Sequence, residues 1–221
     1  MTDPILKIDG VSKRFTRKPG LIVSGLDKLT GRNSTQTVHA VNDVTLSVPR
    51  GEVLGIVGES GCGKSTLGRV VSGIYAPSDG SVTLEGKPVA RDHGGNVDKL
   101  TTRVQMIHQD PFASLNPRMK VGEIIAEGPR VHGLVPVREV QERVRSLLEQ
   151  VGLEGAYANR LPHQFSGGQR QRVAIARALA MQPELLVLDE AVASLDVSIQ
   201  AQVLNLFMKL RRELNLMSAI G

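Results

Sequence analysis

The alternation of apolar and polar residues along the chain predicts its strands and helices. Residues 5–11 and 38–48 alternate in polarity, which is typical of half-buried strands, and they open the chain as an antiparallel pair. Residues 52–57 and 185–188 are short, continuous apolar runs of the kind found in strands buried on both faces of a parallel sheet. Further strands are expected at 81–84 and 103–107, and helices at 137–151, 168–181 and 199–214. This alternation of strands and helices indicates an α/β fold with a mostly parallel sheet.

Two segments interrupt the pattern. Residues 16–37 contain prolines, glycines and a polar run, so we expect a long loop between the first two strands. A helical insert of roughly 50 residues, the size of a small subdomain, lies between the strand at 103–107 and the helix that begins near 168. The sequence therefore predicts a single domain over residues 1–221, with a helical subdomain at about 110–167 inserted into a core formed by 1–109 and 168–221.

The composition limits the class of protein. The 221 residues are enough for one large domain, and a content of 41% hydrophobic and 22% charged residues is typical of globular proteins. The formal net charge of +5 favours an anionic partner, whereas 3% aromatic residues argue against a surface that stacks on bases. The single cysteine, Cys62, cannot form an internal disulfide and favours a reducing compartment. No apolar stretch is long enough to cross a bilayer, so a membrane role would require a partner protein.

A glycine-rich segment follows the apolar run at 52–57. It reads Gly58, Glu59, Ser60, Gly61, Cys62, Gly63, Lys64 and Ser65, and it matches the pattern of a phosphate-binding loop in full. The glycines let backbone N–H groups turn inward as an anion nest, Lys64 supplies a charge for the β- and γ-phosphates, and the Ser65 hydroxyl can ligate Mg²⁺. From Thr66 the chain can continue as a helix whose N-terminus faces the phosphates. A simple glycine turn is the alternative, but the flanking strand and helix favour phosphate binding.

The second buried strand, 185–188, ends in two carboxylates, Asp189 and Glu190. Open parallel sheets bind ligands at the carboxyl ends of their strands. Asp189 is suited to hold Mg²⁺, directly or through water, and Glu190 is placed to orient or deprotonate an attacking water. An apolar strand that ends in two acids is common and by itself usually marks only a strand end. Together with the loop at Gly58, the two acids predict a site that binds and cleaves a nucleoside triphosphate.

A third motif precedes the helix expected at 168–181. It contains Phe165, Ser166, Gly167, Gly168 and Gln169. One interpretation is a plain helix start, with Ser166 as the N-cap. The other is a second anion site, because a serine hydroxyl, flexible glycines and a helix N-terminus together form a cradle for a terminal phosphate.

These three motifs, in this order, resemble those of the ATP-binding subunits of ATP-binding cassette (ABC) transporters, with Phe165 where the family usually has leucine. The resemblance covers nearly the whole chain. It implies a P-loop NTPase core of the RecA-like kind, with an N-terminal antiparallel β subdomain and an inserted helical subdomain. It also implies a head-to-tail dimer with a second ABC ATPase subunit, in which the segment Ser166, Gly167, Gly168 and Gln169 acts in trans on the other subunit's ATP. The arginine-containing helix after Gln169 then belongs to that interface, so no nucleic-acid partner is expected.

The resemblance assigns roles to three further residues. Gln109 is similar to the glutamine that senses Mg²⁺ and the γ-phosphate and links the core to the helical subdomain. Asp196 resembles the acid that crosses the dimer interface, although the usual order before it is Ser-Ala-Leu rather than Ala-Ser-Leu. Phe15 resembles the aromatic residue that stacks on adenine, and a core residue at a strand end is the alternative. The expected catalytic residues are Glu190, Lys64 and Gln109, and the expected Mg²⁺ ligands are Ser65, Gln109 and Asp189.

Three longer stretches narrow the resemblance. Residues 57–66, 109–119 and 195–206 are similar to those of importers of oligopeptides, dipeptides and nickel. This implies an ATP-hydrolysing energy-coupling subunit, bound to the cytoplasmic side of the inner membrane by two transmembrane permease subunits and served indirectly by an extracytoplasmic solute-binding protein. The segment after Gln109 is expected to face the permeases. Peptides are favoured over nickel only because peptide importers are the larger group.

The end of the chain departs from the family pattern. The family continues into one more core strand, a histidine that contacts the γ-phosphate, and a C-terminal extension. Here Met217 to Ile220 are expected to supply at most a stub of that strand, and no histidine follows Asp196. We therefore expect a sheet that lacks an edge strand and tends to aggregate, and a chain that binds ATP but hydrolyses it poorly. A catalytically impaired nucleotide-binding module and a soluble ABC ATPase that is not linked to transport stay open as alternatives.

Overall fold

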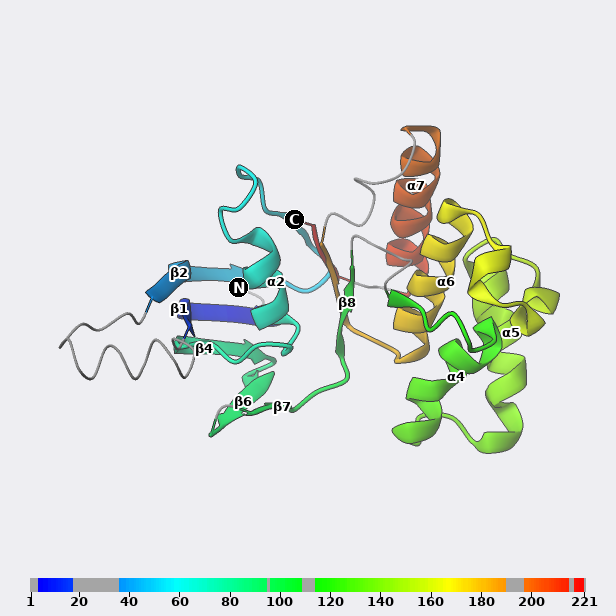
Figure 1. Ribbon diagram of the computed structural model, residues 1–221, viewed down its shortest axis with the longest axis horizontal. Helices are drawn as coiled ribbons and strands as arrows, with labels where there is room; N and C mark the ends of the chain where they lie inside the picture. The colour runs from blue at the N-terminus through cyan, green and yellow to red at the C-terminus, as the bar shows by residue number, and fades with distance from the viewer. Residues whose placement is uncertain are drawn as a thin grey trace, which may run out of the picture.

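The computed structural model describes residues 4–17, 36–94, 96–108, 114–189, 197–214 and 217–220. An antiparallel β part, a parallel sheet and a helical part follow one another across the molecule (Figure 1). Within the described ranges, no helix is both long enough and apolar enough to span a bilayer. Three residues singled out by the sequence, Gln109, Glu190 and Asp196, lie outside these ranges.

The antiparallel sheet has the strand order β2-β1-β4-β5. Its strands are β1 (Leu6–Arg17), β2 (Gln36–Val48), β4 (Asp79–Leu84) and β5 (Lys87–Pro88). The pairing of β1 with β2 runs from Leu6 opposite Val48 to Arg17 opposite Gln36, which confirms the antiparallel opening that the alternating pattern predicts. A separate hairpin of β6 (Ala90–His93) and β7 (Asn96–Lys99) follows, and the polarity pattern does not reveal it.

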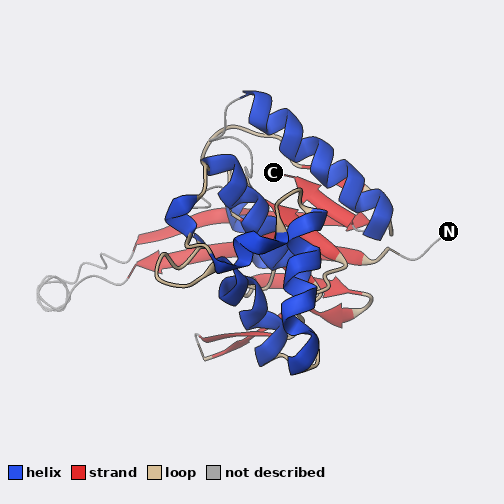
Figure 2. Ribbon diagram, turned by 90° about the vertical axis from the view of Figure 1, so that its right-hand side faces the viewer, coloured by secondary structure: helices blue, strands red, loops and turns tan. Residues whose placement is uncertain are grey.

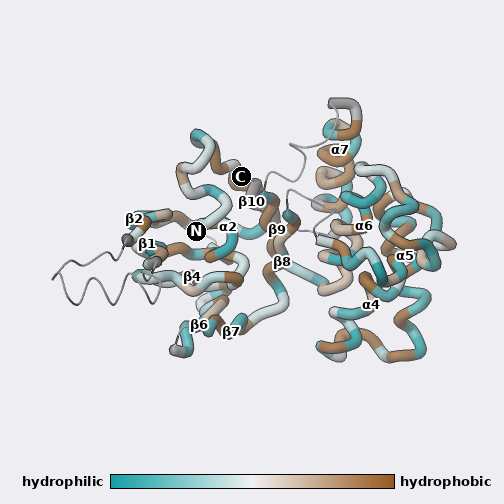
Figure 3. Tube along the Cα trace, in the orientation of Figure 1, coloured by the Kyte–Doolittle hydropathy of each residue, from teal (hydrophilic) through white to brown (hydrophobic). Residues whose placement is uncertain are grey.

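The second sheet is parallel, with the strand order β3-β10-β9-β8. Its strands are β3 (Val53–Gly55), β8 (Val104–Ile107), β9 (Leu185–Leu188) and β10 (Met217–Ile220). All four residues of β9 are buried, as its continuous apolar run predicts, and Figure 3 colours this strand as hydrophobic. Because β9 pairs with β8 on one side and β10 on the other, Asp189 lies in the middle of the sheet's carboxyl edge.

Two expectations about the parallel sheet are wrong. The segment Met217–Ile220 is not a stub that leaves an edge open: β10 is an interior strand that pairs in parallel with both β3 and β9. The run at 52–57 is not buried on both faces, since only 53–55 form a strand and Val53 is 38% exposed. Among the described residues, β3 is an edge strand of the parallel sheet, with a neighbouring strand on one side only. Its side chains are therefore less covered than those of the interior strand β9.

The helices confirm the predicted helical segments and add one. They are α2 (Lys64–Val71), α4 (Val121–Val131), α5 (Val140–Gln150), α6 (Gly167–Ala180) and α7 (Val197–Leu214), with 3₁₀ turns at Val137–Glu139, Gly155–Asn159 and Pro162–Gln164. Helix α4 is the addition, and it carries Pro129 inside. Viewed from the helical side, α4, α5 and α6 pack against one another in front of the strands (Figure 2).

Two hydrophobic clusters flank the parallel sheet, and β9 contributes to both. Leu185 and Val187 join the cluster that contains β1, β4 and α2. Leu186 and Leu188 join the cluster of the helical part. This division follows from the period of two in a strand, which points successive side chains to opposite faces. The sheet is therefore held from both sides just below the carboxyl ends of its strands.

Candidate nucleotide-binding site

The segment 58–63 turns from β3 into α2, and Lys64 is the first residue of that helix. The Lys64 Nζ atom donates hydrogen bonds to the main-chain oxygens of Gly58 at 2.7 Å and Glu59 at 2.9 Å. The ammonium group is thus folded back onto the loop that precedes it. The first backbone N–H groups of α2 lack helical partners and lie at the positive end of the helix dipole. The loop therefore combines a cation with a helix N-terminus, which is the chemistry that binds phosphate.

Two glycines of the loop are needed for its shape. Gly63 has φ 104°, and a Cβ atom there would lie 2.1 Å from the main-chain oxygen of Ala40 in β2. Only glycine fits such a left-handed position against another backbone. At Gly58, a Cβ atom would lie 2.7 Å from the Sγ atom of Cys62, whose thiol is free and exposed. The loop therefore packs closely against β2 at Gly63, and the Cys62 side chain packs against the loop at Gly58.

Asp189 is brought to the same place from the far end of the sequence. It directly follows β9, its main-chain N–H donates to the oxygen of Ile107 at 3.1 Å, and it is only 8% exposed. Asp189 and Lys64 line one small cavity of about 20 Å³, whose other walls are apolar. The structure thus unites the phosphate-loop lysine with the first of the two predicted carboxylates, as the sequence predicts.

These groups suit a magnesium ion. Mg²⁺ prefers oxygen ligands and is usually held by one or two protein groups together with the phosphates of the substrate. The nearly buried Asp189 carboxylate and the Ser65 hydroxyl, in the first turn of α2, supply such oxygens. In the described part of the chain no cluster of three or more His, Cys, Asp or Glu side chains occurs.

The motif at Ser166 begins α6 with a capping box. The Ser166 Oγ atom accepts a hydrogen bond from the Gln169 N–H at 3.3 Å, and the Ser166 N–H donates to Gln169 Oε1 at 3.0 Å. Phe165 is 3% exposed and packs edge to face with Tyr157, at 5.7 Å between ring centroids. The plain N-cap interpretation is therefore correct for this chain alone. It leaves Ser166 exposed, whereas Gly167 and Gln169 are half-buried and Gly168 is buried.

A pocket of about 420 Å³ adjoins the phosphate loop. It is lined by residues of β2, from His39 to Leu46, and by loop and α2 residues that include Val57, Cys62, Gly63 and Lys64. Sequence reasoning missed the part played by β2, because its alternating pattern indicates a strand but not which face adjoins the loop. The sequence signal that could have indicated this pocket is Val57, an apolar residue directly before the loop. The structure shows that Val57 is exposed.

Phe15 is not among the residues that line this pocket. Its ring is 38% exposed, so it is not a core residue, and it packs edge to face with Tyr75 at 5.4 Å between centroids. The Lys13 Nζ atom lies 5.3 Å from the Phe15 centroid. The aromatic residue of β1 is thus available at the surface, in contact with the segment that follows α2.

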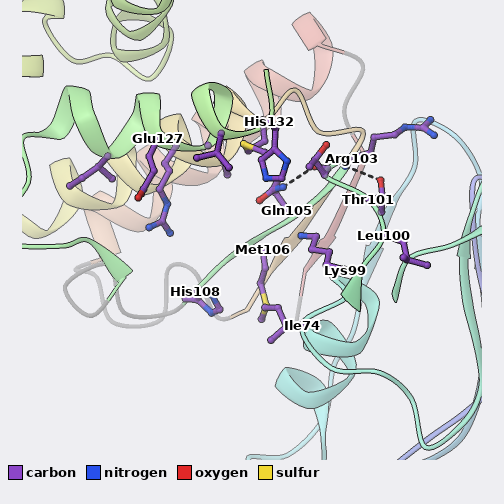
Figure 4. Close-up of a pocket in the computed structure, with 17 residues that line it drawn as sticks. Ile74, Lys99, Leu100, Thr101, Arg103, Gln105, Met106, His108, Glu127 and His132 are labelled. Atoms are coloured by element: carbon purple, nitrogen blue, oxygen red, sulfur yellow. Dashed lines mark hydrogen bonds between the residues drawn. The ribbon is translucent and has the colours of Figure 1, made fainter. Parts of the chain in front are cut away.

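A larger groove of about 890 Å³ separates the strand β8 from the helical part (Figure 4). We call it the β8–α4 groove. Its walls come from the segment before β8, from β8 itself, and from α4 and α6, and they include Lys99, Arg103, Gln105, Met106, His108, Glu127, Val131, His132, Arg177 and Met181. The cations Lys99, Arg103 and Arg177 outnumber the single carboxylate of Glu127. Sequence reasoning missed this groove, since it arises only when α6 packs against β8 and α4 packs against α6.

Neighbouring groups determine the position of Arg177 and the charge of His108 in the β8–α4 groove. The Arg177 guanidinium donates a hydrogen bond to the main-chain oxygen of Ser114, which ties α6 to the start of the helical part. Partial burial lowers the pKa of His108, and the charges of Arg177 and Arg69 lower it further. The imidazole is therefore neutral at pH 7, which leaves the guanidinium as the charge at this end of the groove.

Comparisons with known proteins agree with this geometry. The chain is 46% identical over 215 residues to the oligopeptide transport ATP-binding protein OppF of Bacillus subtilis, an alignment that covers 96% of this chain and 65% of that protein. It is 45% identical over 211 residues to the glutathione import ATP-binding protein GsiA of Pectobacterium atrosepticum, covering 96% of this chain and 32% of that protein. The chain therefore spans less than two thirds of the length of these curated relatives.

A solved structure has the same fold. It is that of cbiO1 from Clostridium perfringens, described as part of the ABC transporter complex cbiONQ, with a TM-score of 0.75, 29% sequence identity, and coverage of 99% of this chain and 78% of that one. The similarity includes the parallel sheet, the antiparallel part and the helical part, so the α/β class and the P-loop NTPase architecture are confirmed. The model of the ABC transporter family matches residues 41–193, a range that contains both the phosphate loop and the Ser166 motif. By its sequence and its fold, this chain belongs to the ABC transporter family.

Proposed function

We propose that the chain is an ATP-binding and ATP-hydrolysing subunit that supplies the energy for an ABC importer. The observation that carries this proposal is that Lys64, the first residue of α2, and Asp189, directly after β9, line one small cavity although they are far apart in the sequence. A cation and a helix N-terminus on one side, with a carboxylate on the other, suit a triphosphate with its Mg²⁺.

The free chain suggests how Lys64 acts. Its ammonium group now satisfies two main-chain oxygens, those of Gly58 and Glu59. When ATP enters, the β- and γ-phosphates offer stronger, charge-assisted hydrogen bonds, so the ammonium group exchanges partners without leaving the loop. Lys64 and the loop N–H groups then stabilise the charge that develops as the γ-phosphate is transferred to water.

Other residues would bind Mg²⁺ and activate the attacking water. Ser65 and Asp189 would hold Mg²⁺, with Gln109 as a further ligand, and the ion would supply Lewis-acid stabilisation of the phosphate oxygens. Glu190, the next residue after Asp189, orients the attacking water and accepts its proton. Gln109 and Glu190 enter this proposal through the family resemblance, since both lie outside the described residues.

A second subunit completes each site. The N-terminus of α6, with the exposed Ser166 hydroxyl, has the groups of an anion cradle. We place it against the γ-phosphate bound by a second ABC ATPase subunit, with Asp196 at the same interface. ATP then closes the dimer and hydrolysis reopens it. Adenine would stack on the exposed ring of Phe15, which pairs with Val38 beside the pocket along β2.

The transported solute is proposed to be a peptide. The relatives support this, because those compared here are named for oligopeptide transport and glutathione import. A peptide-like solute is common to both names. Selection of the solute would rest with an extracytoplasmic solute-binding protein and with the permeases, so this chain acts on it only indirectly.

Two transmembrane permease subunits would bind the chain through the β8–α4 groove and hold it at the cytoplasmic face of the inner membrane. The groove is lined by the apolar side chains of Met106, Val131 and Met181 and by the cations Lys99 and Arg177, whereas Arg103 is paired with Glu85 and Glu184. A short cytoplasmic helix of a permease, with one apolar face and a carboxylate, is complementary to such walls. The groove also lies between the strand that precedes Gln109 and the helical part, so a helix bound there would sense nucleotide-driven movement.

The change Val131→Glu tests the proposed permease contact. Val131 lines the groove and is 76% exposed, so the variant should fold and bind ATP as the wild type does. An unpaired carboxylate buried against a permease helix should reduce co-purification of two polytopic membrane proteins about tenfold or more. The measurement is mass spectrometry of the proteins that a tagged chain retains from solubilised membranes.

The matched control is Val137→Glu, because Val137 is equally apolar, is 82% exposed and does not line the groove. It should retain the membrane proteins fully. Equal retention by the two variants would contradict the groove as the contact. If the wild-type chain retained no membrane protein at all, a soluble ABC ATPase without a transport role would be the better account.

A further inference from the structure

The guanidinium group of Arg172 connects three helices. Arg172 lies on α6, and its Nη1 atom donates a hydrogen bond to the main-chain oxygen of Val151 at 2.8 Å. Its Nη2 atom donates a second hydrogen bond to Oε1 of Gln202 at 3.2 Å. Val151 is the C-cap of α5, and Gln202 lies on α7. One side chain therefore links the helical part, through α5, to both α6 and α7.

The contact with α5 depends on the residue that follows that helix. The last carbonyl groups of a helix lack helical partners and lie at its negative end, so a cation that binds one of them is stabilising. Gly152, directly after Val151, has φ 74°, and a Cβ atom there would lie 2.6 Å from Nη1 of Arg172. Glycine thus leaves the space that the guanidinium occupies.

Two contacts at different levels fix the relative direction of α6 and α7, which lie side by side (Figure 1). A Cβ atom at Gly168 would lie 2.7 Å from Cγ2 of Ile199, so the two helices approach closely there. One turn further along α6, Arg172 binds Gln202, which comes three residues after Ile199 in α7. Both contacts advance in the same sense along the two helices. The helices therefore run parallel over this stretch, and their N-termini lie at the same end.

The residues proposed to face the second subunit belong to that shared end. Ser166 is the N-cap of α6, and α7 begins at Val197, directly after Asp196, which lies outside the described residues. Arg172 comes six residues after Ser166, and Gln202 comes five residues after Val197, so their hydrogen bond lies within two turns of both helix starts. A change in the angle between α6 and α7 would break this bond and would move one start relative to the other.

We infer that Arg172 is a positioning residue that makes the starts of α6 and α7 move as one body when the dimer closes on ATP. Its bond to Val151 attaches the same body to the end of α5, so the helical part carries both starts with it. This inference rests on the proposed function and deepens it, because it names the residue that holds the Ser166 motif in place for the other subunit's ATP. Arg172 lines neither pocket beside the phosphate loop, so it does not act on the nucleotide of its own chain.

The test uses Arg172→Met and Gln202→Leu, each in a chain that also carries Glu190→Gln to retain the ATP-bound dimer. Light scattering with MgATP at increasing protein concentration gives the dimer dissociation constant. Each change should raise that constant about tenfold, which is the effect of losing one hydrogen bond to a charged group. The double variant should dimerise no more weakly than Arg172→Met alone, because both changes break the same bond between α6 and α7.

The affinity of the dilute, monomeric chain for MgATP should be unchanged in both variants, which separates positioning from nucleotide binding. Gln202→Leu keeps the bond between Arg172 and Val151, and Gln202 is exposed, so this variant tests the link to α7 even where Arg172→Met fails to fold. Lys209→Met is the matched control. Lys209 is an exposed cation of α7 whose ion pair with Glu213 lies within that helix, so its loss should leave the dimer dissociation constant unchanged.

An unchanged dimer dissociation constant in Gln202→Leu would overturn the inference, whatever the result for Arg172→Met, because Arg172 would then serve only to cap α5. A lower affinity of the monomeric Gln202→Leu chain for MgATP would also overturn it, since the link would then act on the chain's own site. If the parent chain bound no MgATP or formed no dimer with it, the proposed function itself would fail, and the inference with it.

Discussion

Replacing Lys64 by alanine is expected to lower the affinity for MgATP about 100-fold or more. The ammonium group would form charge-assisted hydrogen bonds with two phosphates, each worth about 1.5–3 kcal/mol. Since every 1.4 kcal/mol is about a tenfold change in affinity, the loss of both corresponds to about two to four orders of magnitude. The measurement is a calorimetric or fluorescence titration of the purified chain with MgATP.

The control for this change is Lys87→Ala. Lys87 lies on β5 and is exposed, so its removal alters the net charge by the same amount without touching the loop. Its affinity for MgATP should equal that of the wild type. Wild-type affinity in the Lys64 variant would mean that the phosphates do not bind at this loop.

Replacing Glu190 by glutamine is expected to slow ATP turnover about 10²–10⁴-fold, the contribution of a well-placed general base. The affinity for MgATP should be retained, because the side chain acts on the attacking water and not on the phosphates. The variant should therefore accumulate the ATP-bound, closed dimer. Phosphate release by the complex with its membrane subunits measures the first effect, and light scattering with ATP measures the second.

A loss of turnover with an unchanged affinity for MgATP is the result expected for Glu190 and not for other carboxylates. Glu52→Gln is the control, because Glu52 is exposed and lies just before β3. It should leave both quantities unchanged. Turnover that persisted in the Glu190 variant at the wild-type rate would exclude Glu190 as the base.

The sequence predicted the centre of the fold well, for physical reasons. The run at 185–188 is apolar at every position, and such a strand can only be buried on both faces, so the strand and the position of Asp189 at its end followed directly. The glycines and Lys64 predicted a phosphate loop because they match its pattern between a strand and a helix. An N-cap at Ser166 was one of two interpretations of that motif, and the structure adds the reciprocal bonds between Ser166 and Gln169.

Other features depend on contacts that no local pattern contains. The strand Met217–Ile220 is short, and it lies between β3 and β9 because it forms backbone hydrogen bonds with both of them. The β8–α4 groove requires α4 to pack on α6, which contacts β8, and α4 carries Pro129, which argues against a helix when the sequence is read alone.

The most direct test of the whole account uses the wild-type chain and its single cysteine. Cys62 is exposed in the phosphate loop, and its Sγ atom lies where a side chain at Gly58 would have to be. With MgATP at about ten times its dissociation constant, about one chain in eleven is free, so alkylation of Cys62 by a bulky maleimide should slow about tenfold. Mass spectrometry over time gives the rate. An alkylation rate that saturating MgATP leaves unchanged would contradict the placement of the nucleotide at this loop.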